Sequence, residues 1–288
     1  MKMLPVGIQT FRTIIEDDYL YIDKTEIARS LIEKYRYVFL SRPRRFGKSL
    51  FLDTLKDIFE GNRELFSGLL IEDQWNWELK YPVILVSFSG GINSKADLEA
   101  DLLYILQSNE KRLGLKCENR VRPQHFFAEL IEKAYEKYHQ KVVILIDEYD
   151  KPILDNIENI PEALLIRDGL RDFYTKIKDN DRCLRFAFLT GVSKFAKVSI
   201  FSGLNNIEDI SFNPAVGNVC GYTQLDLDTT FAPYLEGVDM ERVKRWYNGY
   251  NFLGDRVYNP YDILLLSRTN VCSRTIGSKL ARQNFSLS

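Results

Sequence analysis

The stretch that decides the fold spans residues 36 to 50 and reads Arg36-Tyr-Val-Phe-Leu-Ser-Arg-Pro-Arg-Arg-Phe-Gly-Lys-Ser-Leu50. Its first part is a short apolar run of β-forming residues, which predicts a buried strand, and the Arg42-Pro43 pair marks the turn that ends this strand. Helix-forming residues follow from Ser49 to Phe59. This order of strand, turn and helix, with Gly-Lys-Ser at the turn, is typical of a P-loop, in which backbone N–H groups hold phosphates.

Gly47, Lys48 and Ser49 provide the chemistry that a phosphate site needs. In a P-loop the lysine reaches the outer phosphates, the hydroxyl binds Mg²⁺, and the helix N-terminus adds positive charge. The complete motif has a glycine five positions before Gly47, where this chain has Arg42. A Gly-Lys-Ser tripeptide alone also fits a basic turn that caps a helix, so a second motif is needed.

The second motif is the run Val142-Val-Ile-Leu-Ile146, which is followed at once by Asp147 and Glu148. Four of its five apolar residues are β-branched, which predicts a strand buried on both faces of a parallel sheet. Acids at the carboxyl end of such a strand lie where open α/β sheets bind ligands. An isolated pair of acids would merely begin a turn. Combined with Gly47-Lys48-Ser49 in the expected order, the pair predicts the Walker A and Walker B motifs of one nucleotide site.

Another strand is predicted from Leu184 to Leu189, and it ends at Thr190. In nucleotidases that keep an extra strand between the P-loop strand and the Walker B strand, the extra strand ends in a polar residue near the γ-phosphate. We therefore predict that the hydroxyl of Thr190 orients the attacking water. The alternative is that Thr190 only forms a turn.

The composition is that of a globular protein without a strong overall field. The 288 residues include 45% hydrophobic residues, enough for one large or two modest domains. Thirty-nine basic and 40 acidic residues leave a net charge of −1, so the net charge gives no support to nucleic-acid binding, although local basic patches are compatible with it.

Cysteine, histidine and apolar patterns exclude several classes of protein. The four cysteines have no paired spacing and only two histidines accompany them, so neither a disulfide framework nor a zinc site is expected. The N-terminus lacks an apolar signal core, and no segment approaches about 18 apolar residues. We expect a cytoplasmic protein that does not enter a membrane.

Together these segments predict an α/β fold with a mainly parallel sheet flanked by helices. A further buried strand is expected from Val83 to Phe88, and helices are expected after Ser94 and from Pro123. We expect residues 1–212 to form the P-loop core with an N-terminal lead-in. Residues 213–267 are expected to form a small, lid-like, mainly helical subdomain, and residues 268–288, which lose periodicity, an irregular or truncated tail.

Several segments resemble the prokaryotic AAA-ATPase-like family, and the likeness covers residues 5 to 265. They are Tyr21-Ile-Asp-Lys-Thr25, Arg42-Pro-Arg-Arg-Phe-Gly-Lys-Ser49, Ile146-Asp-Glu-Tyr-Asp150, Leu189-Thr-Gly191, Tyr247-Asn-Gly-Tyr250 and Tyr258-Asn-Pro260. The resemblance implies an ASCE-type P-loop fold, with Walker A at Gly47, Lys48 and Ser49 and Walker B at Asp147 and Glu148. Within that family an arginine at the position of Arg42 is normal.

Members of that family often carry a PD-(D/E)XK nuclease-like domain after the P-loop module. This sequence ends at Ser288, shortly after Asn259-Pro260, and has no Asp…Glu-x-Lys constellation there. Nuclease chemistry is therefore not expected of this chain.

The predicted activity is Mg²⁺-dependent ATP binding and hydrolysis. We expect residues 42–49 (Arg42, Pro43, Arg44, Arg45, Phe46, Gly47, Lys48 and Ser49) to hold the nucleotide. Ser49 and Asp147 are expected to position the metal, and Lys48, Glu148 and Thr190 to act in catalysis, with Glu148 as general base or water-orienting group. Charge that develops on the phosphate oxygens needs a further cation, from Arg44, Arg45 or another arginine.

Two other functions are compatible with the same motifs. One is an ATP-binding switch or adaptor with little turnover, which would not need the acid at Glu148. The weaker one is a nucleic-acid-associated module that uses Arg42, Arg44 and Arg45. An unidentified protein partner and a homo-oligomer are compatible with either function, and the sequence identifies neither.

Overall fold

In the computed structural model, which describes residues 1–88, 90–193, 206–247 and 249–285, the four predicted strands and one short strand that was not predicted, Glu208–Asp209, form one five-stranded sheet. Its members are β1 (Tyr37–Ser41), β2 (Val83–Ser87), β3 (Val142–Asp147), β4 (Leu184–Gly191) and β5 (Glu208–Asp209). They pair only in parallel, in the order β2-β3-β4-β1-β5. The strand that ends at Thr190 was predicted to lie between the other two motif-bearing strands, and β4 does lie between β1 and β3.

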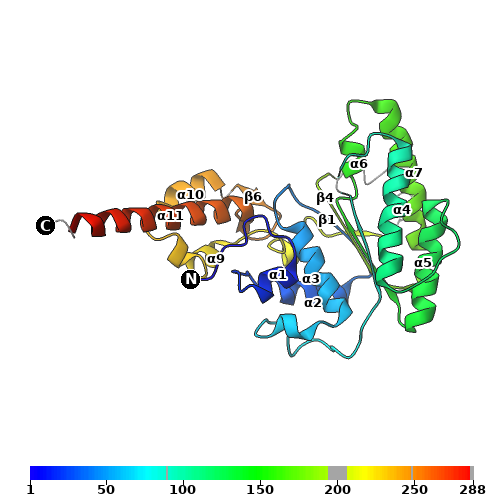
Figure 1. Cartoon of the computed structure of the whole chain (residues 1–288), viewed down its shortest axis with the longest axis horizontal. Helices are drawn as coiled ribbons and strands as arrows, with labels where there is room; N and C mark the ends of the chain where they lie inside the picture. Colours follow the sequence, from blue (N-terminus) through cyan, green and yellow to red (C-terminus); the bar gives the residue numbers. More distant parts are fainter. Residues whose placement is uncertain (89, 194–205, 248, 286–288) are drawn as a thin grey trace. The chain divides into compact units, whose positions relative to one another are not determined.

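Helices cover both faces of this sheet (Figure 1). On one face α4 (Lys95–Arg112), α5 (Pro123–Tyr138) and α7 (Ile160–Asp179) pack side by side. Phe127 of α5 stacks on Phe173 of α7, with ring centroids 4.4 Å apart. On the other face lie α2 (Thr25–Lys34) and α3 (Lys48–Glu60), where Phe59 packs on Phe186 of β4. This is the predicted α/β architecture of a P-loop NTPase.

The chain divides into two compact units. The sheet unit comprises Thr25–Arg44 and Leu52–Ser211, and the helical unit comprises Met1–Lys24, Arg45–Phe51 and Phe212–Ser288. The helical unit contains α1 (Phe11–Glu16), α9 (Gln224–Asp228), α10 (Met240–Tyr247), α11 (Pro260–Phe285) and an antiparallel pair, β6 (Tyr250–Asn251) and β7 (Arg256–Val257).

The N-terminal lead-in packs in the helical unit, whereas the sequence grouped it with the core. Leu4, Val6, Leu20 and Ile22 pack against a cluster of buried residues from 227 to 264. The hydroxyl of Tyr234 also donates to the carbonyl of Lys2 (2.7 Å). The lead-in is apolar on one side, and residues more than 200 positions later cover that side.

The C-terminal residues are helical rather than irregular as far as Phe285. Pro260 occupies the first position of α11, where its missing N–H costs nothing, and the Asn259 side chain accepts a hydrogen bond from the N–H of Tyr261 (3.0 Å). After this start the sequence from 268 to 285 contains no proline and a single glycine, so nothing stops the helix. In the described residues no helix is long and apolar enough to span a bilayer.

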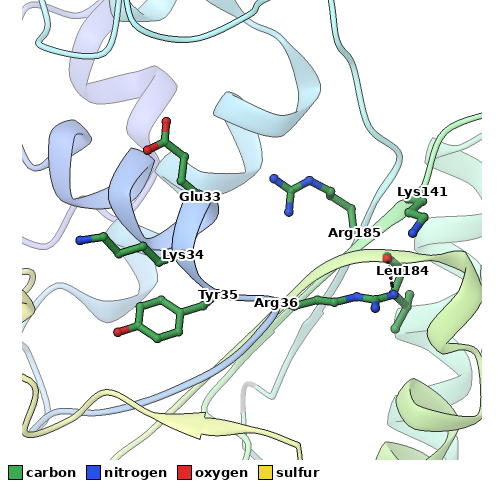
Figure 2. Close-up of a pocket in the computed structure, with 7 residues that line it drawn as sticks. All are labelled: Glu33, Lys34, Tyr35, Arg36, Lys141, Leu184 and Arg185. Carbon is green, nitrogen blue, oxygen red and sulfur yellow. Dashed lines mark hydrogen bonds between the residues drawn. The ribbon is translucent and has the colours of Figure 1, made fainter.

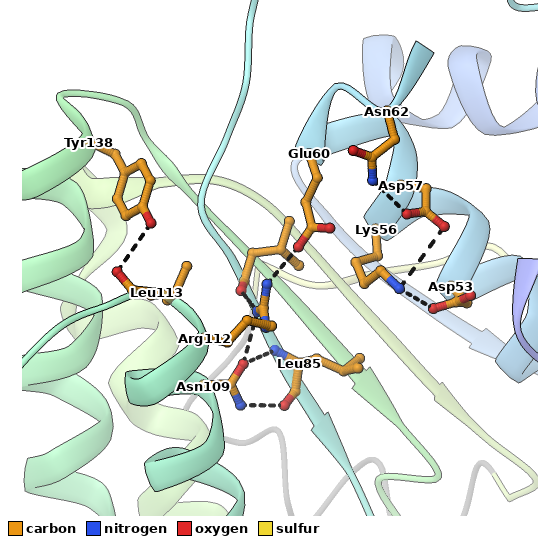
Figure 3. Close-up of polar contacts among 11 residues, drawn as sticks. Asp53, Lys56, Asp57, Glu60, Asn62, Leu85, Asn109, Arg112, Leu113 and Tyr138 are labelled. Atoms are coloured by element: carbon orange, nitrogen blue, oxygen red, sulfur yellow. Dashed lines mark hydrogen bonds and ion pairs between the residues drawn. The ribbon is translucent and has the colours of Figure 1, made fainter. Parts of the chain in front are cut away.

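Side chains cover the open edge of β2 (Figure 3). The amide of Asn109 on α4 donates to the carbonyl of Leu85 (2.7 Å) and accepts from its N–H (2.9 Å). The guanidinium of Arg112 donates to the carbonyl of Val83 and to the carboxylate of Glu60 (2.6 Å). These groups take the hydrogen bonds that a neighbouring strand would otherwise make.

Figure 3 also shows Asp57, a carboxylate of α3 that is 1% exposed. Burial raises its pKa to about 6, against the opposing effects of the Lys56 charge and a hydrogen bond from the Asn62 amide (2.7 Å). The Oδ2 atom of Asp57 has no hydrogen-bond partner among the described residues, and the Lys56 ammonium lies 4.0 Å from it. Asp57 therefore destabilises the fold when it is ionised.

We expect Asp57→Asn to stabilise the protein at pH 7.5 by about 1–2 kcal/mol, and far less at pH 4.5. The folded pKa lies above the unfolded value of about 3.9. Between the unfolded and the folded pKa the folded protein therefore keeps a proton that the unfolded chain has already released. The free energy of unfolding falls as pH rises through this range, until Asp57 is ionised in both states above about pH 6. Urea unfolding of the wild type and of Asp57→Asn at the two pH values measures the difference in the free energy of unfolding. Asp73→Asn, at an exposed carboxylate, is the control, and an equal gain at both pH values would contradict the assignment.

Candidate functional site

Asp147 and Thr190 lie at the carboxyl ends of the adjacent strands β3 and β4. The hydroxyl of Thr190 donates a hydrogen bond to the carboxylate of Asp147. Thr190 also accepts from the N–H of Glu148 at its hydroxyl (3.4 Å) and from the N–H of Tyr149 at its carbonyl (2.9 Å). The sheet thus brings together three predicted site residues from segments more than 40 positions apart.

Burial defines what Thr190 contributes. Its side chain is 0% exposed, and Asp147 is 5% exposed. A hydroxyl has one proton to donate, and here Thr190 donates it to Asp147. In this arrangement Thr190 orients a carboxylate, whereas the sequence assigned it to orienting a water molecule.

Glu148 follows the strand in an unusual backbone conformation. Its φ is +53°, a left-handed value that a non-glycine residue rarely adopts and that turns the chain away from the sheet. The half-buried side chain lines a cavity of about 180 Å³ together with Arg44, Asp150, Lys151, Leu154 and Val192. Among the described residues Glu148 makes no ion pair. Pockets for whole small molecules measure about 300–1,000 Å³, so this space suits water or a phosphate group.

Sequence reasoning did not single out Tyr149 and Asp150, the two residues that follow Glu148, although both lie in the Ile146–Asp150 segment of the family resemblance. Asp150 is 1% exposed and accepts hydrogen bonds from the N–H groups of Val192 (3.2 Å) and Ser193 (2.7 Å). Tyr149 donates from its hydroxyl to the carbonyl of Ser193 (2.9 Å). Burial and the charge of Asp150 raise the pKa of Tyr149. These contacts fix the loop after β4 against the loop after β3.

Gly191 allows this close packing, and we expect Gly191→Ala to destabilise the fold by about 3 kcal/mol or more. A Cβ atom at Gly191 would lie 2.4 Å from Cε1 of Tyr149 and 2.7 Å from Oδ1 of Asp150, so the ring or the backbone must move. Urea unfolding measures the loss. Gly249→Ala is the control, because no atom lies within 4 Å of its added Cβ. A decrease of less than about 0.5 kcal/mol in the free energy of unfolding of Gly191→Ala would show that the end of β4 relaxes around the added methyl group at little cost.

Arg42 braces the start of the loop after β1. Its guanidinium donates to the carbonyls of Ser41 (2.9 Å) and Ser211 (2.8 Å). The backbone N–H of Arg42 donates to the carbonyl of Gly191 (3.1 Å). The side chain is 1% exposed. The structure gives Arg42 a structural role, whereas the sequence placed it among the phosphate-binding residues and the nucleic-acid candidates.

Arg45 and Phe46 are held within the helical unit by aromatic side chains. The guanidinium of Arg45 lies over the ring of Tyr261, 4.1 Å from its centroid. Phe46 makes edge contacts with Tyr250 (4.6 Å) and Phe252 (5.9 Å) and is 1% exposed. Of the two arginines predicted to supply a cation, Arg45 is therefore engaged by a ring, whereas Arg44 lines the cavity beside Glu148.

Gly47 directly precedes α3, and Lys48 and Ser49 begin this helix. Gly47 has φ +88°, a conformation that favours glycine, and its carbonyl accepts the first helical hydrogen bond from the N–H of Phe51 (3.0 Å). Lys48 and Ser49 are the first two residues of the helix, where backbone N–H groups have no partner within the helix and the dipole is positive. Lys48 is 5% exposed.

Comparison with known proteins gives one family and one relative. The family described as "Predicted AAA-ATPase" (AAA-ATPase_like) matches residues 5–201. A protein of Azotobacter chroococcum mcd 1, described as "Uncharacterized protein in vnfD 5'region", is 54% identical over 270 residues, which cover 92% of this chain and 52% of the relative. The chain thus spans about half the length of this relative. No solved structure matches this chain.

Proposed function

Since the chain belongs to the AAA-ATPase-like family, we propose that it binds ATP with Mg²⁺ and hydrolyses it, in the service of an unidentified partner or process. One observation above all supports this proposal. The hydroxyl of Thr190 fixes the carboxylate of Asp147 at the tip of the β3–β4 pair, and Glu148, which makes no ion pair among the described residues, follows directly. One acid that a hydroxyl holds in place, beside a second acid that makes no ion pair in the described part of the chain, suits one metal-binding and one proton-accepting carboxylate.

The donor groups present fit a triphosphate and a hard cation. Lys48 and the N–H groups at the start of α3 offer positive charge and donors to phosphate oxygens. The Ser49 hydroxyl and the Asp147 carboxylate are oxygen ligands of the type that Mg²⁺ prefers. When bound, Mg²⁺ would neutralise charge on the phosphate oxygens.

In the proposed reaction Glu148 accepts a proton from the attacking water at its carboxylate. Thr190 acts through Asp147 and is therefore a positioning residue. Arg44 faces the same cavity as Glu148, which makes it our candidate for the cation that stabilises the developing charge.

Phosphate release by the purified chain tests this proposal. We expect saturable release from ATP that requires Mg²⁺ and stops with a chelator. Saturable ATP binding without release above that of Lys48→Ala would make the chain a nucleotide-dependent switch, and the absence of both would refute a nucleotide site.

A further inference from the structure

A second cavity lies at the opposite, amino-terminal edge of the sheet (Figure 2). It measures about 340 Å³ and is lined by Glu33, Lys34, Tyr35, Arg36, Lys141, Leu184 and Arg185. These residues precede or begin β1, β3 and β4, which are neighbours in the sheet. Because β3 contains six residues and strands rise by about 3.3 Å per residue, roughly 20 Å separates this cavity from Asp147.

Two guanidiniums of this amino-edge cavity are anchored by backbone carbonyls. Arg36 donates to the carbonyls of Asp181 (2.5 Å) and Leu184 (3.0 Å), and lies 3.3 Å from the Asp181 carboxylate. Arg185 donates to the carbonyl of Ile32 in the last turn of α2 (3.3 Å). Carbonyls position a guanidinium without cancelling its full charge, so both cations are held in place before any ligand arrives.

The remaining charges of the cavity leave it positive. Lys34 and Lys141 are exposed and make no ion pair within the described part of the chain. The single acid of the lining, Glu33, is paired with Arg29 (2.7 Å). Asp181 offsets part of the charge of Arg36. Four cations thus surround a space in which each available acid already has a partner.

The end of α2 opposes this positive charge only weakly. A helix C-terminus carries partial negative charge, which disfavours an anion nearby. Here the hydrogen bond from Arg185 satisfies the Ile32 carbonyl, and Lys34 provides a cation in the same turn. The cavity therefore suits an anion with more than one charge.

We propose that the amino-edge cavity is a binding site for a phosphate-bearing ligand, separate from the ATP site. Phosphate offers several oxygens and up to two charges to two guanidiniums and two ammonium groups, and guanidinium forks match its geometry. A volume of about 340 Å³ is within the range of small-molecule pockets. A mononucleotide and the terminal phosphate of a nucleic-acid strand present the same group.

The substitution Lys141→Glu tests this proposal, because Lys141 is exposed and its side chain makes no hydrogen bond or ion pair among the described residues. Fluorescence anisotropy with a labelled single-stranded oligonucleotide, carrying a 5′ phosphate, is measured in a Lys48→Ala background that weakens the ATP site. We expect Lys141→Glu to weaken binding about tenfold and Lys116→Glu, an exposed lysine outside the cavity, by less than about twofold. Thermal melts establish that both variants fold, and Lys141→Gln replaces Lys141→Glu if that variant does not.

Competition identifies the source of the phosphate. Displacement by AMP or inorganic phosphate supports a small ligand, whereas displacement only by a second 5′-phosphorylated strand supports nucleic acid. Equal loss in the Lys141 and Lys116 variants, no binding of any probe, or equal displacement by polyglutamate would overturn the proposal. In an otherwise unchanged chain, Lys141→Glu should leave phosphate release from ATP as in the wild type, so the two proposals fail independently.

Discussion

Replacement of Lys48 by alanine is expected to lower kcat/KM for ATP hydrolysis by about 10²–10³-fold and to weaken ATP binding with it. Lys48 begins α3 and is 5% exposed, so its ammonium acts where water screens little. In the proposed site this charge faces the phosphates both before and during the reaction. Its removal should therefore affect binding and turnover together.

Phosphate release under steady-state conditions and equilibrium binding of a fluorescent ATP analogue measure these effects. Lys48→Arg serves as a second variant, because it keeps the charge but replaces a compact ammonium by a planar fork. We expect it to recover little activity. A Lys48→Ala protein that folds, binds ATP and hydrolyses it at the wild-type rate would rule out the P-loop assignment.

Replacement of Glu148 by glutamine is expected to lower kcat by about 10²–10⁴-fold while the affinity for ATP changes by less than about threefold. Glutamine keeps the shape of the side chain but does not accept a proton from water. Because Glu148 forms no ion pair among the described residues, loss of its charge leaves no described cation without its partner. The fold should therefore tolerate the change.

Single-turnover phosphate release, with ATP binding measured in parallel, separates chemistry from affinity. Glu158→Gln is the matched control, since Glu158 is an exposed acid ten positions further along the chain, and we expect a change of less than about twofold. Wild-type turnover in Glu148→Gln would exclude the general-base role. An equal loss of affinity and turnover would instead assign Glu148 to binding.

The four longer strands and most helices of the sheet unit could be predicted because each carries its own local signal, whereas β5, which has only two residues, carries none. The run from Val142 to Ile146 is apolar throughout, as a strand covered on both faces must be. Ser94 accepts a hydrogen bond from the N–H of Asp97 (3.1 Å), and Pro123 opens α5, so both helices begin at recognisable residues. Local patterns of this kind also identified the carboxyl tips of β3 and β4.

Features that depend on distant contacts were missed. The burial of Arg42 rests on the carbonyl of Ser211, 169 positions away, and an arginine beside a P-loop gives no local sign of such a partner. The N-terminal lead-in joins a cluster formed by residues 227 to 264 for the same reason. Asp150 reads as a turn former until the N–H groups of Val192 and Ser193 are placed against it. The polar helix α11 lacks a periodic apolar stripe beyond residue 268, so periodicity did not reveal it.

Asn109 and Arg112 have a consequence for how copies of this molecule meet. The amide of Asn109 engages both the N–H and the carbonyl of Leu85, and the guanidinium of Arg112 engages the carbonyl of Val83. A strand from another chain finds these three backbone groups already bonded, which disfavours cross-molecule sheet growth and the fibrils that it produces. We expect Asn109→Leu, which removes this amide, to leave the N–H and the carbonyl of Leu85 open to a strand of another chain.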